Sequence, residues 1–195
     1  MNPKHLRLPR LGVHPFAAAG LFFLFCATPR AYAFAVLSSV ILHEAGHLIA
    51  SLLFGRAPQS IRLMPAGISI TLPPPRSYKE ELTVAAAGPA VSLLWYAVTR
   101  YLPSVASEET AGITLILAVL NLLPITGFDG GRICHALISF TASEALADRL
   151  LATTTALSLS VLWTLSLYVL FYSGVNVALL FFCACLFFAL IAKKL

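Results

Sequence analysis

The chain has 195 residues, of which 59% are hydrophobic and only 11% are charged. A soluble domain of this length carries about 25% charged residues, so the composition excludes a large soluble domain and indicates an integral membrane protein. The formal net charge is +5. Because the basic residues are spread over the ends of apolar segments, the charge pattern does not form a nucleic-acid-binding stripe and instead reflects membrane topology.

Six apolar segments have the length and composition of helices. The first is short, the fourth ends in an irregular stretch that contains Gly and Pro, and the other four are long enough to span a bilayer. Since there is no internal repeat and no linker, we predict one all-α polytopic domain of about six transmembrane helices over residues 1–195. Its core lies at about 31–135 and a C-terminal helix pair at about 150–192. The segments run approximately over Pro15–Ala27, Ala31–Phe54, Leu82–Tyr101, Ala111–Ile125, Leu150–Tyr172 and Val175–Ala192.

The first segment has two interpretations. Lys4, Arg7 and Arg10 precede it, and Ala31-Tyr32-Ala33 follows it. This order resembles a secretory signal with an A-x-A cleavage site, and cleavage would leave a second segment that is still long enough to span. The distribution of positive charge favours a retained first helix.

The second segment contains His43-Glu44-Ala45-Gly46-His47 within membrane-like flanks. Histidines at i and i+4 lie on one helix face, about 40° apart, where they can share one zinc ion. Glu44 sits beside that metal position and can take a proton from a water that the zinc activates. Ionisable side chains inside a transmembrane segment are costly, so their presence indicates function.

Residues 55–80 connect the second and third segments. The stretch from Ile61 to Leu72 partly alternates between apolar and polar residues around a Pro/Gly turn, which predicts a short membrane-associated β-hairpin at about 60–72. Its exposed edge could pair with an unwound substrate strand. An interfacial loop without a substrate role is the equally weighted alternative.

Asn121 and Asp129 lie at the end of the fourth segment, in Asn121-Leu-Leu-Pro124-Ile-Thr-Gly127-Phe-Asp129-Gly130-Gly131. We expect Asp129 at the end of the fourth helix, as a third zinc ligand beside one position left for water. The alternative is an ordinary helix cap or Asx turn. For Asn121, contact with substrate backbone or a developing oxyanion and a plain interhelical hydrogen bond are both open.

The lysines and arginines predict the orientation. Eleven lie on one side of the six segments, against Arg30 and Arg100 on the other. The positive-inside rule then places both termini in the cytoplasm. His43 lies 12 residues past Ala31, about 18 Å into a hydrocarbon core about 30 Å thick, in its cytoplasmic half. Asp129 is expected at a comparable depth.

HEAGH in a membrane segment, followed about 80 residues later by NLLPITGFDGG, resembles the site-2 protease family of intramembrane zinc metalloproteases (peptidase family M50). Val13-His14-Pro15-Phe16 and Leu63-Met64-Pro65-Ala66-Gly67 look most like its bacterial stage IV sporulation branch, which cleaves a membrane-associated pro-sigma factor. The resemblance implies that His43, His47 and Asp129 bind one Zn²⁺, that Glu44 activates water, and that the second to fourth helices form the catalytic core.

Some residues depart from this family pattern. Phe128 stands where Leu is usual, and Ser92 follows Gly88-Pro89 where many members carry Asn, which puts a polar contact from the third segment in doubt. The sporulation enzymes often append a CBS domain, and we expect none here. His14 and His135 are not included in the expected metal set.

The leading hypothesis is therefore an intramembrane zinc endopeptidase of the bacterial cytoplasmic membrane that cleaves a membrane-anchored regulator near the cytoplasmic side. The family resemblance implies a pro-sigma factor as the substrate. An anti-sigma factor or a remnant signal peptide fits the chemistry equally well. A regulatory membrane partner is a further expectation. The alternatives are a zinc-binding but inactive membrane scaffold and, less favoured, an ion transporter.

Overall fold

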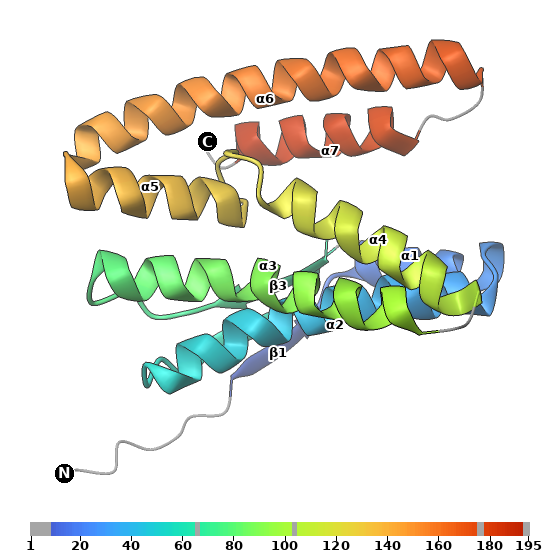
Figure 1. Cartoon of the computed structure of the whole chain (residues 1–195), viewed down its shortest axis with the longest axis horizontal. Helices are drawn as coiled ribbons and strands as arrows, with labels where there is room; N and C mark the ends of the chain where they lie inside the picture. The colour runs from blue at the N-terminus through green and yellow to red at the C-terminus, as the bar shows by residue number, and fades with distance from the viewer. Residues whose placement is uncertain (1–8, 65–66, 103–104, 175–177, 193–195) are drawn as a thin grey trace. The chain divides into compact units, whose positions relative to one another are not determined.

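A computed structural model describes residues 9–64, 67–102, 105–174 and 178–192. The chain divides into two compact units, Met1–Leu122 and Leu123–Leu195, which are described in turn. The cartoon in Figure 1 gives the order of their elements.

The first unit is built on three helices that pack on one another, α2, α3 and α4 (Figure 1). Small side chains allow this close approach: a Cβ on Gly46 of α2 would lie 2.6 Å from the carbonyl oxygen of Ala87 on α3. A buried hydrogen bond of 2.6 Å between the hydroxyls of Ser39 and Thr114 joins α2 to α4. The helices of this unit are α1 (Pro15–Ala27), α2 (Arg30–Leu53), α3 (Tyr78–Tyr101) and α4 (Val105–Asn121).

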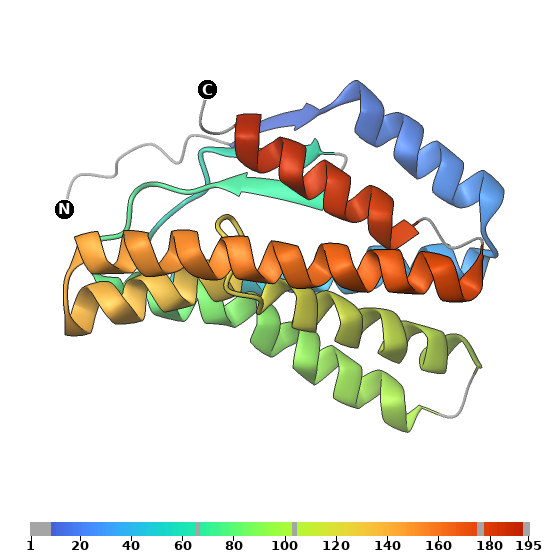
Figure 2. The same cartoon turned by 90° about the horizontal axis from the view of Figure 1, so that it is seen from above.

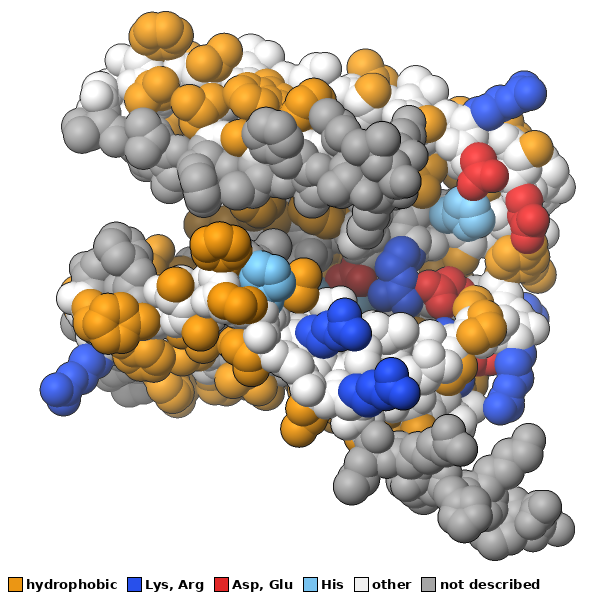
Figure 3. Space-filling model, turned by 180° about the vertical axis from the view of Figure 1, so that it is seen from behind, with side chains coloured by type: hydrophobic (Ala, Val, Ile, Leu, Met, Phe, Trp, Pro, Cys, Tyr) orange, Lys and Arg blue, Asp and Glu red, His pale blue; other side chains and the backbone are white. Residues whose placement is uncertain are grey.

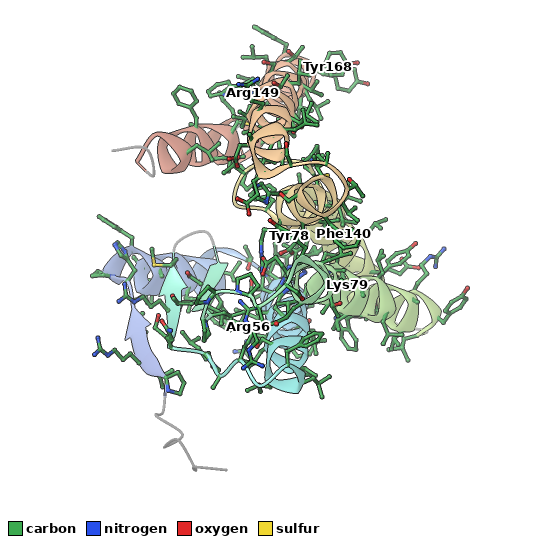
Figure 4. All side chains as sticks on the ribbon, turned by 90° about the vertical axis from the view of Figure 1, so that its left-hand side faces the viewer. Arg56, Tyr78, Lys79, Phe140, Arg149 and Tyr168 are labelled. Atoms are coloured by element: carbon green, nitrogen blue, oxygen red, sulfur yellow. The ribbon has the colours of Figure 1, made fainter. Side chains whose placement is uncertain are left out.

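The end of α2 and the start of α3 are held together by a buried ion pair. Gly55, with a φ of 70°, ends α2, and the backbone N–H of Arg56 donates to the carbonyl of Ser51, as in a Schellman cap. Arg56, labelled in Figure 4, then places its Nε 3.1 Å from Glu80 Oε1. The same Nε–H also donates to the carbonyl of Pro73, in the segment that returns from the strands. One arginine thus connects both helices with the strand region.

Three strands form a small sheet in the order β1-β2-β3 (Figure 2). The predicted hairpin is confirmed: β2 (Ser60–Met64) pairs antiparallel with β3 (Gly67–Thr71). Its turn residues Pro65 and Ala66 lie outside the described part of the chain. The sequence interpretation missed β1 (Arg10–Val13), which pairs parallel with β2, because four residues of a parallel strand with a distant partner carry no local pairing signal.

The second unit contains α5 (Asp129–Thr141), α6 (Glu144–Ser173) and α7 (Ala178–Ala192). Side chains of α6 hold the irregular segment that precedes α5. The hydroxyl of Thr155 accepts a hydrogen bond from the backbone N–H of Thr126 at 2.9 Å, and the hydroxyl of Thr154 donates to the carbonyl of Pro124 at 3.1 Å. Non-helical backbone at membrane depth requires such partners.

The structure corrects part of the predicted helix layout. Within the described residues, three helices are long and apolar enough to cross a membrane, α2, α3 and α6, against the six predicted. The fourth apolar segment is helical to Asn121 and not to Ile125, and α5 was not predicted, because its polar and glycine-rich start gave no apolar run. Hydrophobic side chains cover much of the helix surfaces in Figure 3, as expected for a membrane protein.

Candidate metal centre

The two histidines of the HEAGH motif lie on one face of α2, as their spacing predicted. Both side chains are buried. Their Nε2 atoms are 3.3 Å apart, and the planes of the two rings are inclined at 82°. The imidazoles therefore converge on one point and do not stack.

The other ring nitrogen of each histidine is held by α3. His47 Nδ1 lies 2.8 Å from the carbonyl oxygen of Val84. A carbonyl only accepts, so His47 carries its proton on Nδ1 and presents an Nε2 lone pair. His43 Nδ1 lies 2.8 Å from the hydroxyl of Ser92, which fixes the orientation of the second ring. Metal-binding histidines are commonly oriented in this way through the nitrogen that does not contact the metal.

The separation of the two Nε2 atoms fits a zinc ion. Zinc binds imidazole nitrogen at about 2.0–2.1 Å in tetrahedral geometry, which requires two ligating nitrogens to be about 3.3–3.4 Å apart. The observed 3.3 Å meets this requirement. The chemistry of the pair, two imidazole nitrogens in a buried position, also suits zinc.

Gly88 makes room for the ring of His47. A Cβ at position 88 would overlap Nε2, Cε1 and Cδ2 of that imidazole. Pro89 follows and has no N–H to donate to the carbonyl of Ala85, which weakens the hydrogen-bonding of α3 next to the carbonyl that holds His47. The Gly88-Pro89 pair is therefore part of the site, although it provides no ligand.

We predict that Gly88→Ala displaces His47 and weakens zinc binding by at least about 10-fold, the lower end of the cost of disturbing a ligand's support. The added methyl group should also destabilise the fold by about 1–3 kcal/mol through overpacking. Gly112→Ala is the matched control, since a Cβ there meets no described atom within 4 Å. A helix gains up to about 1 kcal/mol from such a change. Chelator competition and thermal unfolding in detergent measure the two effects, and equal behaviour of both variants would contradict the steric role of Gly88.

Ser92 stands where many family members carry Asn, which had put a polar contact from the third segment in doubt. The structure shows that the Ser92 hydroxyl makes such a contact. Its side chain is fully buried, and its hydroxyl is shared with His43. The sequence drew attention to position 92 because it follows Gly88-Pro89. It did not indicate that His43 is the hydrogen-bond partner of Ser92.

Ser92→Ala is expected to lower zinc affinity about 10- to 100-fold, because the partner that orients a histidine ligand is lost. Ser51→Ala is the control: Ser51 is an equally buried serine of α2 whose hydroxyl donates to the carbonyl of Leu48. Zinc competition titrations would show the loss in the Ser92 variant and not in the control. Unchanged affinity in the Ser92 variant would mean that packing alone orients His43.

Glu44 and Asn121 belong to the same unit as the histidines. Glu44 lies between them on α2 and is half-buried. Asn121 is the last residue of α4 and is also half-buried. The roles predicted for both residues remain predictions.

Asp129 was expected at the end of the fourth helix, and this is corrected: it is the first residue of α5, after the N-cap Phe128. The helix α4 ends at Asn121, and Gly127 adopts a φ of 95° in the connection. A carboxylate in the first turn of a helix is favoured by the helix dipole. Asp129 belongs to the second compact unit, and its role as a zinc ligand is taken up below as a proposal.

The two histidines that were left out of the metal set have local partners. His14 caps α1, where its Nδ1 accepts from the backbone N–H of Phe16 at 3.4 Å. His135 Nε2 lies 3.0 Å from Asp148 Oδ1 and connects α5 to α6. Both contacts suit ordinary structural histidines.

Comparison with known proteins adds two findings. The family model described as Peptidase M50B-like matches residues 16–128, more than half of the chain. Among solved structures, the fold is similar to that of the site-2 protease from Methanocaldococcus jannaschii, with a TM-score of 0.65 at 20% sequence identity, over 94% of this chain and 91% of the other. No curated protein matches the sequence.

Proposed function

The chain belongs to the Peptidase M50B-like family, and from this premise we propose that it is an intramembrane zinc metalloendopeptidase. The observation that carries the proposal is the histidine pair on α2. Its two Nε2 atoms are spaced for one zinc ion, both rings are oriented from α3, and Glu44 stands between them in the sequence.

We propose that His43, His47 and Asp129 hold the zinc. Each offers one ligand atom suited to a metal ion. Two nitrogen donors and one carboxylate form a common ligand set of catalytic zinc sites and leave a position for water. Zinc bound there would act as a Lewis acid and lower the pKa of water to about 7.

Glu44 is proposed as the general base and acid. Its carboxylate takes a proton from the attacking water and gives it to the nitrogen of the cleaved peptide bond. Asn121 is proposed to contact the substrate backbone or the developing negative charge on the carbonyl oxygen. The described structure supports these roles by placing both residues, half-buried, in the unit that holds the histidines.

The proposed substrate is a membrane-anchored regulatory protein, with a pro-sigma factor as one candidate, cleaved near the cytoplasmic side of the membrane. The proposed topology has both termini in the cytoplasm, on the basis of the lysine and arginine distribution. A membrane-spanning helix must unwind before hydrolysis because its carbonyls are internally hydrogen-bonded. The edge of β3 is a candidate to pair with the unwound strand.

Metal removal tests the enzyme. The purified protein should cleave an internally quenched peptide with one transmembrane span, lose this activity when a chelator removes the metal, and regain it with Zn²⁺ but not with Mg²⁺. The control is the same protein treated with chelator already saturated with zinc. Stoichiometric zinc without any cleavage would favour the inactive scaffold, and zinc flux into vesicles without cleavage would favour the transporter.

A further inference from the structure

The register of the small sheet separates its side chains by polarity. Directly paired residues in neighbouring strands point to the same face, and successive residues alternate. Leu11 pairs with Ile61, which pairs with Ile70. Two residues further along β1, Val13 pairs with Leu63, which pairs with Ile68. These six residues form what we term the apolar sheet face. The polar sheet face carries Arg10, Ser60, Arg62, Ser69 and Thr71, with Met64 at its end.

The apolar sheet face is only partly covered. Its residues on β2 and β3 are half-buried, and β3 packs against α2. On β1, in contrast, Leu11 is 79% exposed and Val13 is 64% exposed. The strand therefore exposes two large apolar side chains at the edge of a face whose other residues are half-buried.

This exposed strip continues into an apolar helix. The strand β1 runs directly into α1 (Figure 2), with only His14 between them. The backbone N–H of His14 donates to the carbonyl of Leu63 at 2.9 Å, which fixes the junction to the sheet. The first turn of α1 exposes Phe16. Because α1 consists almost entirely of apolar residues, the surroundings that suit α1 also suit the exposed side chains of β1.

The opposite face carries positive charge. Arg10 and Arg62 are both exposed and belong to neighbouring strands. The aliphatic part of Arg62 lies over Gly12, where a Cβ would be 3.4 Å from Arg62 Cγ. An arginine that lays its stem on the sheet can extend its guanidinium outward. The described sheet residues, 10–13, 60–64 and 67–71, include no acidic side chain.

We propose that the sheet lies flat in the membrane–water interface, with the apolar sheet face toward the acyl chains and Arg10 and Arg62 toward anionic phospholipid phosphates. An interfacial amphipathic helix buries its apolar face about 5–10 Å into the boundary of headgroups and acyl chains. A sheet that buries its apolar face in the same way would bring its other face to the level of the phosphates. Continuity with α1 and charge complementarity favour lipid over a protein partner. The proposal rests on the membrane location of the chain and not on its catalytic activity.

The proposal gives β1 a function in the mature protein. Cleavage after Ala33 would remove both β1 and α1, and with them the exposed apolar strip. The intact mass of the purified protein must therefore include residues 10–13, which is a first and simple check.

Photocrosslinking of the full-length protein in phospholipid nanodiscs tests the orientation of the sheet. A benzophenone amino acid replaces Leu11 or Val13 on the apolar sheet face, and Ser69 on the polar sheet face is the matched control, since it is exposed on a neighbouring part of the same sheet. The expected yield of phospholipid adducts, read from the intact mass, is several-fold higher at positions 11 and 13 than at 69. Equal yields, or adducts at position 11 with a second protein copy in place of lipid, would overturn the proposal.

The charged face is tested separately. Wild-type protein purified from mixed phosphatidylglycerol and phosphatidylcholine bilayers should retain phosphatidylglycerol preferentially, as read by native mass spectrometry. A double variant with Arg10→Gln and Arg62→Gln should lose this preference several-fold, whereas Arg100→Gln at the end of α3 should keep it. An unchanged preference in the double variant would remove the phosphate contacts from the proposal. Neither result depends on peptide cleavage, so failure here is distinct from failure of the proposed enzyme.

Discussion

Replacing Glu44 with Gln is expected to abolish peptide-bond cleavage while leaving zinc bound. The amide of Gln has nearly the shape of the carboxylate but cannot accept a proton from water at neutral pH. General acid–base catalysis contributes about 10²- to 10⁴-fold to a rate, and one side chain here is assigned both proton transfers. We therefore expect a loss of at least about 10³-fold in kcat, with little change in zinc content, because Glu44 is not proposed as a ligand.

The measurement is the rate of cleavage of a membrane-spanning peptide, with zinc per chain determined on the same preparation. Glu109→Gln is a suitable control, since Glu109 is an exposed glutamate of α4 outside the motif. Retained turnover in the Glu44 variant would assign the base to another group. Loss of zinc together with activity would show that Glu44 supports the metal site, and the variant would then not separate chemistry from binding.

Replacing Asp129 with Ala is expected to remove zinc from a protein that otherwise binds one ion per chain. Loss of one of three protein ligands should cost more than the about 10- to 100-fold that follows when a ligand loses its hydrogen-bond partner. The change also removes a carboxylate from the first turn of α5, worth about 0.3–1 kcal/mol. It removes as well the 3.4 Å contact of Asp129 with Arg132 Nη1, a partly exposed pair worth about 0–1 kcal/mol. The effect on zinc should therefore far exceed the effect on folding.

Zinc per chain in detergent-purified wild type and variant measures this effect directly. Asp148→Ala is the matched control, because Asp148 is an aspartate of the same compact unit that pairs with His135. Stoichiometric zinc in the Asp129 variant would exclude this residue as the third ligand. An absence of zinc in metal-replete wild type would turn the interpretation toward a non-catalytic protein.

Much of the site could be predicted because its signals are local. The spacing of His43 and His47 places both rings on one helix face whatever surrounds the helix, and the structure confirms this. The same applies to the hairpin of β2 and β3, whose strands are neighbours in the sequence. The membrane class follows from composition alone, since a helix in lipid must be apolar over its length.

Other features depend on contacts between segments that are distant in the sequence. The location of Asp129 at the start of α5 was missed. Pro124 and Gly127 indicate that the preceding helix ends, but they do not indicate where the next helix begins. Threonines of α6 hydrogen-bond to the backbone N–H of Thr126 and to the carbonyl of Pro124. Nothing in the sequence of the segment around Pro124 indicates that α6 provides these partners. The parallel strand β1 was missed for the same reason, since each of its residues pairs with one that lies 50 residues further along the chain.

The sequence by itself therefore determined the membrane class, the paired nitrogen donors and the adjacent carboxylate of Glu44. Only the tertiary structure decided how those donors are oriented. The packing of α2 against α3 brings the Val84 carbonyl and the Ser92 hydroxyl to the two Nδ1 atoms and lets Gly88 admit the ring of His47. The physical reason is that helical periodicity fixes the direction in which a side chain leaves its own helix, whereas the partner that holds its ring is set by the packing of another helix 37 to 49 residues away.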